Sequence, residues 1–313
     1  MAESGSTVLR IATRRSALAV WQAKHVQERL RAAHTGLRVE LVPMVTEGDR
    51  NLSGSLAQVG GKGLFVKELE AALLSGAADI AVHSMKDVPA VLPEGLRLGA
   101  FLRGADPRDA FVSARYATID ALPPGARVGT ASLRRQAQLR ALRPDVEVVN
   151  VRGNVGTRLA HVDRGDLDGL LLAHAGLVRL GLQERIRESL DVDRFVPAIA
   201  QGVIGVECRS ADTRTLQRLA PLHDAWTAVR LEAERTLSAR LGGACTVPVA
   251  GHARRADGHL RLIGLVAAPD GKRVVRGSVE GPRATARELG ERLAAQLLAA
   301  GGREILAALG VHP

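Results

Sequence analysis

Short runs rich in β-branched residues alternate with helical patterns over the first two thirds of the chain, and this alternation limits the possible fold more than any other feature. Residues 8–13, "VLRIAT", predict a strand. Ser16 then caps a predicted helix with apolar residues at helical spacing, and residues 38–45, "RVELVPMV", predict the next strand. Such alternation is typical of βα units on a largely parallel sheet. The sequence therefore predicts an α/β fold with doubly wound sheets.

The same pattern starts again at Asp106, so we expect two α/β lobes followed by a smaller third domain. Residues 196–209, "VPAIAQGVIGVECR", predict a strand that returns the chain to the first lobe, which would make this crossing a hinge. A helix from Trp226 to Leu241, a hairpin over residues 259–281 and a helix over residues 284–298 follow. This last part predicts a small C-terminal α+β domain.

The basic residues are strongly biased towards arginine. The formal net charge is +10, and only five of the 43 basic residues are lysines. Two interpretations stay open: a GC-rich genome inflates arginine, or guanidinium groups bind the carboxylates or phosphates of a ligand in pairs of hydrogen bonds. A nucleic-acid partner is not expected, because seven aromatic residues offer little for base stacking and the chain has no basic tail or zinc pattern.

One local design occurs at three predicted junctions between a strand and a helix. Residues 11–22, "IATRRSALAVWQ", and 128–139, "VGTASLRRQAQL", place Thr, Ser and an arginine pair before a helix, and residues 149–160, "VNVRGNVGTRLA", are a glycine-bearing variant. Free N–H groups at a helix start, short hydroxyls and arginines suit an anion, although Ser and Thr also cap helices for purely structural reasons. Because ligands bind at the carboxyl ends of strands in open α/β sheets, we expect the lobes to close on a polyanionic small molecule.

Residues 78–90, "ADIAVHSMKDVPA", end an apolar strand in polar residues that include Ser84, Lys86 and Asp87. Asp87 could simply stop the strand and pair with Lys86. A carboxylate set among arginines instead stays ionised, and it can then stabilise a cationic intermediate and pass protons.

Residues 58–70, "QVGGKGLFVKELE", place three glycines around Lys62 without the spacing of a phosphate-binding P-loop. The segment is either a mobile lid with one cationic contact or an ordinary flexible loop.

The two cysteines differ in their surroundings. Cys208 closes an apolar run and is expected to be a passive core thiol. Cys245 lies in "RLGGACTVPV", residues 240–249, among small residues where no packed core is expected. From the residues alone, Cys245 is either incidental or a nucleophile or attachment point.

No apolar run approaches the roughly 20 residues that a membrane helix needs. The first residues also lack the apolar centre of a signal peptide. We therefore expect a cytoplasmic protein without a membrane partner, in which both cysteines stay reduced.

Nine segments, in order between Leu9 and Val249, resemble the porphobilinogen deaminase family, also called hydroxymethylbilane synthases, and the likeness runs from about Val8 to beyond Ala307. The segments are "LRIATRRSALAVWQA", "GGKGLFVKELE", "DIAVHSMKDVP", "DPRDAFVS", "GTASLRRQAQL", "RGNVGTRL", "AGLVRLGL", "QGVIGVECR" and "GACTVPV".

This resemblance implies three domains, of which the first two are similar to a periplasmic binding protein. Their expected boundaries are residues 1–102 with 203–220, residues 103–202, and residues 221–313. The implied reaction joins four porphobilinogens with release of ammonia into hydroxymethylbilane, a precursor of tetrapyrroles such as haem. The implied cofactor is a dipyrromethane primer bound through a thioether to Cys245, and no metal is implied.

The resemblance also assigns roles to residues by their position in these motifs. Asp87 corresponds to the catalytic carboxylate and Lys62 to the lysine of the mobile loop. The residues that correspond to the binding site for cofactor and substrate carboxylates, or neighbour it, are Arg14, Ser84, Lys86, Thr130, Ser132, Arg134, Arg135, Arg152, Arg158 and Arg179. The family further implies a monomer.

The chain departs from the usual family pattern at a few positions. Gly242 and Ala244 stand in a loop that usually reads Glu-Gly-Gly-Cys, Gln58 stands where some relatives have lysine, and Trp226 where glutamate is frequent. The alternative function is a bilobed protein that binds an oxyanion without catalysis, in which the loop thiol would have no role.

Overall fold

The computed structural model describes residues 8–46, 66–243 and 247–313, so Lys62 and Cys245 lie outside the described residues. The chain divides into a first unit, Met1–Gly104 with Val203–Ala228, and a second unit, Ala105–Gly202 with Val229–Pro313. The chain therefore passes between the units after Gly104, after Gly202 and within the helix that contains Ala228. The three-domain boundaries expected from the sequence stay a prediction.

The first unit is built on a five-stranded sheet in the order β2-β1-β3-β10-β4. β1 is parallel to both β2 and β3, whereas β10 is antiparallel to both β3 and β4. The elements of this unit are β1 (Val8–Arg14), α1 (Ala17–Ala33), β2 (Arg38–Met44), α3 (Lys67–Leu74), β3 (Ile80–Ser84), the 3-10 turn η1 (Met85–Asp87), β4 (Leu96–Phe101), β10 (Ile204–Arg209), α7 (Thr213–Leu219) and the 3-10 turn η3 (Ala220–Leu222). Helix α8 (Ala225–Arg240) begins in this unit and ends in the second.

Alternate residues of β1 and β3 pack against helices on opposite faces of this sheet. Ile11 and Ile80 belong to a core cluster with Val26 and Leu30 of α1. Ala12, one residue further along β1, belongs to another cluster with Leu69 and Leu73 of α3. Since successive side chains of a strand point to opposite faces, the predicted α/β layering follows directly from this alternation.

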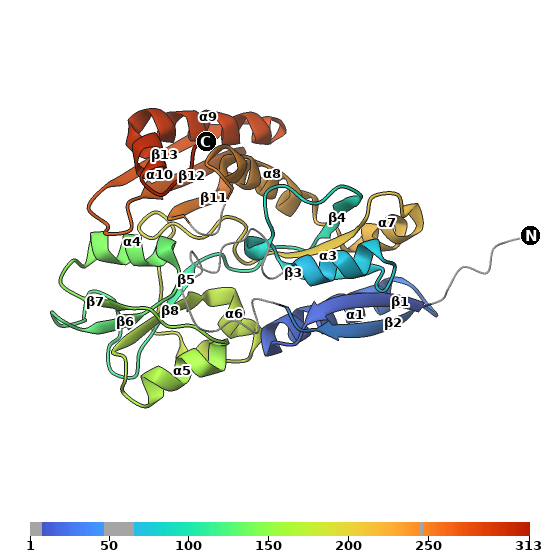
Figure 1. Cartoon of the computed structure of the whole chain (residues 1–313), viewed down its shortest axis with the longest axis horizontal. Helices are drawn as coiled ribbons and strands as arrows, with labels where there is room; N and C mark the ends of the chain where they lie inside the picture. Colours follow the sequence, from blue (N-terminus) through green and yellow to red (C-terminus); the bar gives the residue numbers. More distant parts are fainter. Residues whose placement is uncertain (1–7, 47–65, 244–246) are drawn as a thin grey trace, which may run out of the picture. The chain divides into compact units, whose positions relative to one another are not determined.

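The second unit repeats the same design, with strand order β7-β6-β8-β5-β9. β6 is parallel to β7 and β8, and β5 is antiparallel to β8 and β9. Its elements are β5 (Asp109–Val112), β6 (Arg127–Gly129), α4 (Leu133–Leu142), β7 (Glu147–Val149), α5 (Val155–Asp163), β8 (Gly169–Ala173), α6 (His174–Arg179), the 3-10 turn η2 (Gln183–Arg185) and β9 (Glu188–Ser189). Helix α4 packs on one face, and α5 and α6 pack on the other (Figure 1). The α/β prediction is confirmed for both sheets.

The C-terminal part of the second unit is an antiparallel sheet in the order β11-β12-β13, as the predicted hairpin requires. Its elements are β11 (Val249–Ala256), β12 (His259–Ala267), β13 (Val274–Gly281), the 3-10 turn η4 (Arg283–Thr285), α9 (Ala286–Leu297), a π-helical segment (Leu298–Gly302) and α10 (Arg303–Ala307). A Cβ on Gly264 would approach Leu293 and Leu297 of α9, whereas Ile263 clusters with Ala137 of α4. The small α+β part is thus confirmed, and its sheet is covered on both faces.

The strand predicted over residues 196–209 is wrong in its first half. β10 begins only at Ile204, and before it the chain makes a turn in which the Gln201 N–H donates to the Ala198 carbonyl at 3.0 Å. Ala200 has a φ of 61°, in the left-handed region that an extended strand cannot contain. The apolar pattern of "VPAIA" reflects burial in a turn.

No helix in residues 8–46, 66–243 and 247–313 is long and apolar enough to cross a membrane.

The turn η1, which carries Lys86 and Asp87, is fixed to the first sheet by Met85. The Met85 N–H donates to the Val203 carbonyl at 3.0 Å, and its buried side chain packs against the backbone of Gly205 on β10. A Cβ added to Gly205 would lie 2.1 Å from the sulfur of Met85. Glycine at 205 therefore makes the space that holds Met85 and positions the turn.

We expect Gly205→Ala to lower the free energy of unfolding by about 1–3 kcal/mol, because Met85 is buried and must shift to admit the methyl group. Urea unfolding measures the change. Gly156→Ala is the control: it lies in α5, and beyond its own helix backbone the added Cβ would approach only Oδ1 of Asn154, at 3.5 Å. Equal stability of the two variants would contradict this role of Gly205.

Candidate functional site

In the first unit, the predicted site residues gather where β1 and β3 end. Arg14 is the last residue of β1 and Ser84 the last of β3. The two strands are parallel and pair Ile11 with Ile80, so their carboxyl ends meet at one edge of the sheet. The Ser84 hydroxyl accepts a hydrogen bond of 2.8 Å from the buried amide of Gln22 on α1. This bond ties the first turns of α1 to the end of β3.

Asp87 follows directly after this edge, at the end of η1, and is half-buried. Its carboxylate forms no hydrogen bond or ion pair with another residue of the described chain. Its oxygens are therefore available for further hydrogen bonds, and its catalytic role stays a prediction.

Behind this edge, on the strands themselves, lies a buried cluster that the sequence analysis missed. The imidazole Nε2 of His83 lies 2.9 Å from a carboxylate oxygen of Glu207, and both side chains are almost fully enclosed. Burial and the neighbouring charge of Glu207 raise the pKa of Glu70 on α3. A polar residue in each of two apolar strand patterns, "DIAVHS" and "GVIGVEC", was the available signal.

In the second unit, the predicted residues follow three successive parallel strands. Thr130 comes directly after β6, and Ser132 is the N-cap of α4, where its hydroxyl accepts the Arg135 N–H at 3.5 Å. The Thr130 hydroxyl in turn accepts the Ser132 N–H at 3.2 Å. Arg152 and Arg158 flank the start of α5 after β7, and Arg179 ends α6 after β8. The sheet therefore collects these residues at one edge.

Arg134 and Arg135 both bind an internal carboxylate, that of Asp109 at the start of β5. Arg134 donates to its two oxygens at 2.7 and 3.1 Å, and Arg135 donates twice to one of them at 2.9 and 2.7 Å. Asp109 is fully buried, and both guanidinium groups are nearly so. Although burial opposes its ionisation, the two arginines and the amide of Gln201 hold the pKa of Asp109 far below its usual value. Their binding to a ligand stays a prediction.

Asp109 was not singled out from the sequence, because 25 residues separate it from Arg134. The available signal was an Asp that opens the apolar strand in "DPRDAFVS", since a buried carboxylate requires a partner.

Two of the other three arginines of this edge, Arg158 and Arg179, donate hydrogen bonds to backbone carbonyls. Arg158 Nε donates to the Gly153 carbonyl at 2.7 Å, and Arg179 donates to the Gly202 carbonyl at 2.6 Å. Burial lowers the pKa of Arg179 to about 10. Within the described residues, the buried Nη2 of Arg152 has no hydrogen-bond partner. A buried donor without a partner costs free energy, which an anionic ligand would recover.

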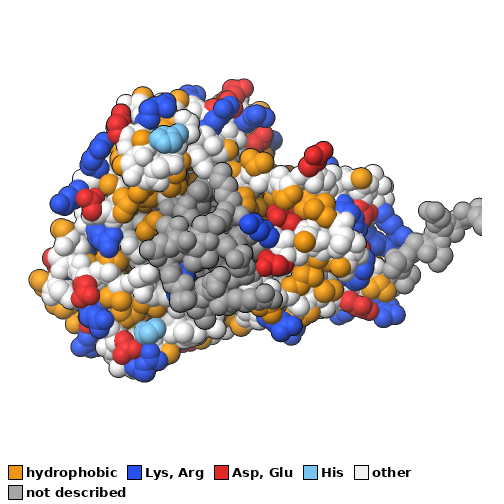
Figure 2. Space-filling view, in the orientation of Figure 1, with side chains coloured by type: hydrophobic (Ala, Val, Ile, Leu, Met, Phe, Trp, Pro, Cys, Tyr) orange, Lys and Arg blue, Asp and Glu red, His pale blue; other side chains and the backbone are white. Residues whose placement is uncertain are grey.

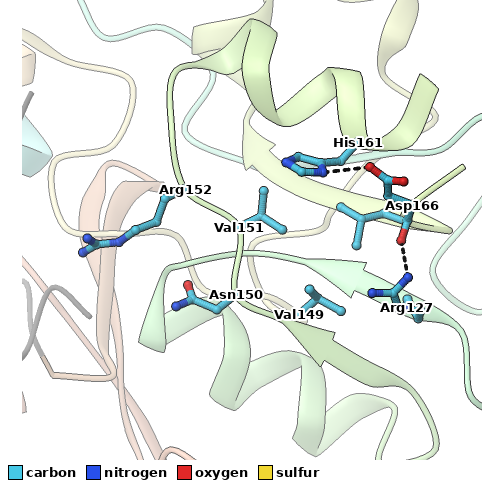
Figure 3. Close-up of a pocket in the computed structure, with 8 residues that line it drawn as sticks. Arg127, Val149, Asn150, Val151, Arg152, His161 and Asp166 are labelled. Carbon is cyan, nitrogen blue, oxygen red and sulfur yellow. Dashed lines mark hydrogen bonds and ion pairs between the residues drawn. The ribbon is translucent and has the colours of Figure 1, made fainter. Parts of the chain in front are cut away.

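A pocket of about 360 Å³ is lined in part by Arg152 (Figure 3). On its opposite side, Arg127 donates to the Asp166 carbonyl at 2.6 Å, and His161 lies 3.1 Å from the Asp166 carboxylate. Figure 3 shows the Arg152 side chain pointing away from these three residues. The polar groups of the pocket wall thus satisfy one another, and Arg152 is not part of their network.

Cys208 is fully buried on β10, and burial raises the pKa of its thiol to about 11. A thiol with so high a pKa is a poor nucleophile at neutral pH. The passive role expected from the sequence is supported.

Both sheets present charged and hydroxyl side chains at the ends of their parallel strands, the arrangement of α/β proteins that bind small polar ligands there. A family model described as "Porphobilinogen deaminase, dipyromethane cofactor binding domain" matches residues 9–217. A second, "Porphobilinogen deaminase, C-terminal domain", matches residues 228–299. The chain belongs to the porphobilinogen deaminase family, the hydroxymethylbilane synthase transferases, and the resemblance seen in its sequence is confirmed.

Solved structures with a similar fold include periplasmic binding domains. The VFT2 domain of BvgS from Bordetella pertussis is 20% identical, with 69% of this chain and 86% of that chain covered and a TM-score of 0.42. The methionine-binding protein MetQ is 12% identical, with 71% and 92% covered and a TM-score of 0.45. A periplasmic substrate-binding protein of an ABC transporter from Coxiella burnetii is 13% identical, with 70% and 94% covered and a TM-score of 0.44.

We expect Asp109→Asn to lower the free energy of unfolding at pH 7 by about 3–5 kcal/mol, because two buried guanidinium groups lose their carboxylate. The native pKa of Asp109 is depressed, so its contribution is complete above the unfolded pKa of about 4 and is lost as the pH falls below it. The difference between wild type and variant should therefore shrink below about pH 4.

Urea unfolding at pH 7, 5, 4 and 3 tests this expectation. Asp120→Asn is the matched control, because Asp120 pairs with Arg194 at the surface and exposed pairs contribute little. A pH-independent difference for Asp109→Asn would show that the ionised carboxylate does not stabilise the fold.

Proposed function

We propose that this chain holds a dipyrromethane primer through a thioether to Cys245 and extends it with four porphobilinogens, in the reaction that its family performs. Each addition breaks a carbon–nitrogen bond of porphobilinogen, releases ammonia and forms a carbon–carbon bond, and water finally frees hydroxymethylbilane. The observation that carries the proposal is the buried Nη2 of Arg152, which follows β7 in the second unit and has no hydrogen-bond partner among the described residues.

The residues present fit a dipyrromethane. Each of its two pyrrole rings carries an acetate and a propionate, so the ligand presents four carboxylates. Arg152, Arg158 and Arg179 supply guanidinium groups, which bind carboxylates through paired hydrogen bonds. Thr130 and Ser132 add hydroxyls beside the first turn of α4, whose N–H groups favour negative charge. The bound primer would supply the pyrrole carbon on which the chain grows.

Arg134 and Arg135 enter this proposal as a buried pair. The two guanidinium groups carry two positive charges against the single negative charge of Asp109, so their buried cluster keeps one net positive charge. Each is also held inside by a backbone carbonyl, that of Val196 for Arg134 at 2.7 Å and that of Leu171 for Arg135 at 3.1 Å. The family motif assigns both to the binding of ligand carboxylates.

Asp87 is the proposed catalytic carboxylate. Its free oxygens would accept hydrogen bonds from the substrate pyrrole N–H and from the departing amino group. An ionised carboxylate would also stabilise the positive charge that remains on the substrate carbon when ammonia leaves. Lys86, Ser84 and Arg14 lie around the same sheet edge and would bind the substrate carboxylates. The mobile-loop role of Lys62 is part of the proposal on the basis of the family motif.

We also propose a cytoplasmic monomer without nucleic-acid or membrane partners, as the family implies. On the face in Figure 2, the Lys and Arg side chains are interspersed with Asp and Glu. A nucleic-acid surface would instead gather basic side chains in a patch or stripe. The free thiol of Cys208 is compatible with a reducing compartment.

Intact-mass spectrometry tests the covalent primer. We expect freshly purified protein to exceed its sequence mass by one dipyrromethane, and Cys245→Ser to lack this excess. Cys208→Ser is the matched control and should keep the adduct, because Cys208 is fully buried with a raised pKa. An unmodified mass in an active preparation would contradict the proposal and favour a non-catalytic oxyanion-binding protein.

Asp87→Ala should fold normally and lose turnover by roughly a hundredfold to ten-thousandfold, the usual contribution of a positioned acid or base. The measurement is hydroxymethylbilane formation at saturating porphobilinogen, with circular dichroism to verify folding. Asp87→Glu, which keeps the carboxylate, should retain more activity than Asp87→Ala. Near-normal turnover in Asp87→Ala would assign the catalytic carboxylate elsewhere.

A further inference from the structure

The segment Ala198–Gly202, just before the chain leaves the second unit, adopts an unusual backbone conformation. Ala200 has a φ of 61° and Gly202 a φ of 85°. Left-handed conformation is ordinary for glycine but unfavourable for alanine, whose Cβ crowds the backbone. Ala200 is also almost fully buried, so surrounding contacts must hold it there.

The carboxylate of Glu234 on α8 supplies such a contact. One of its oxygens accepts the Ala200 N–H at 2.6 Å, and the other accepts the N–H of Ala253 on β11 at 2.9 Å. Glu234 is fully buried, and Arg230 and His252 lie 3.3 and 3.2 Å from its second oxygen. Burial opposes ionisation, but these neighbours keep the pKa of Glu234 below its ordinary value. An ionised carboxylate forms strong bonds to N–H donors.

The two residues after Ala200 contact the arginines of the candidate site. Gln201 donates to the Asp109 carboxylate at 3.0 Å, and its side-chain oxygen accepts from Arg135 at 3.4 Å. The Gly202 carbonyl accepts from Arg179 at 2.6 Å. A displacement of this turn would therefore move the partners of two guanidinium groups at once.

We propose that Glu234 is a positioning residue that holds the left-handed turn at Ala200 and thereby orients Arg135 and Arg179 for the carboxylates of porphobilinogen. The inference rests on the proposed binding of ligand carboxylates by these two arginines. Glu234 itself contacts only protein groups among those that the structure describes, so its effect on substrate passes through the turn.

The test is a double-mutant cycle between Glu234→Gln and Ala200→Gly, with KM and kcat for porphobilinogen as the readout. Glu234→Gln should raise KM about tenfold with a smaller change in kcat, because displaced arginines weaken binding. Ala200→Gly alone should leave KM near wild type, because glycine adopts the same φ without strain. In the double variant, most of the increase in KM should disappear, because the turn no longer needs the carboxylate.

If Glu234→Gln fails to fold, Glu234→Asp takes its place. It keeps the negative charge opposite Arg230 and His252 but shortens the side chain by one methylene, so its oxygens move away from the Ala200 N–H. It should raise KM in the same way. Leu289→Ala, on the α9 face that packs against the C-terminal sheet, is the destabilised control and should leave KM unchanged. A KM defect that Ala200→Gly does not reduce would overturn the positioning role. Intact-mass spectrometry of wild type and each variant separates the positioning role of Glu234 from the proposed function. Absence of the dipyrromethane adduct from wild type would contradict the proposed function, whereas a KM result from proteins that carry the adduct tests only Glu234.

Discussion

The buried carboxylate of Asp109 is the interaction on which the candidate ligand-binding edge of the second unit depends. It holds Arg134 and Arg135 at the start of α4, and Gln201 brings the crossing turn to the same oxygens. The negative charge of Asp109 offsets the desolvation cost of burying the two guanidinium groups, and the cluster still keeps one net positive charge. In the proposed function, an internal counterion that neutralised both arginines would remove the attraction for a ligand carboxylate. The stoichiometry of this cluster would thus serve stability and recognition together.

The two sheets share one arrangement of three parallel strands beside two antiparallel pairings, but they differ in the chemistry at their strand ends. In the first, β1 and β3 lead to Arg14, Ser84 and the free carboxylate of Asp87. In the second, β6, β7 and β8 lead to hydroxyls and guanidinium groups. A lone carboxylate suits the stabilisation of a transient cation, whereas arginines suit permanent carboxylates. In the proposed function, the same scaffold would separate a reactive edge from a binding edge, each assembled by parallel strands that end together.

The sequence predicted the regular elements well, because periodicity is a local property. The strand–helix junction expected within residues 128–139 forms the end of β6 and the start of α4, and Ser16 caps α1 as expected. It could not predict the turn at Ala200, since apolar residues in "VPAIA" fit a buried turn as well as a strand. Nor could it pair Asp109 with the arginines of α4, because that contact depends on how β5 and α4 pack. Motifs in the sequence thus mark residues that follow strand ends, whereas they do not reveal buried carboxylates such as Asp109 that pair inside the fold.

The departure at Gly242 from the usual family glutamate has a physical basis in this chain. Gly242 has a φ of 94°, which side chains other than hydrogen rarely adopt, and an added Cβ would lie 2.3 Å from Cγ1 of Val311. Val311 of the C-terminal segment therefore occupies the space that a side chain at position 242 would need, so this packing requires glycine there. A glutamate here would demand both a different backbone conformation and a displaced Val311. The approach to the cysteine loop is thus set in this chain by packing against its C-terminal segment, with no carboxylate at position 242.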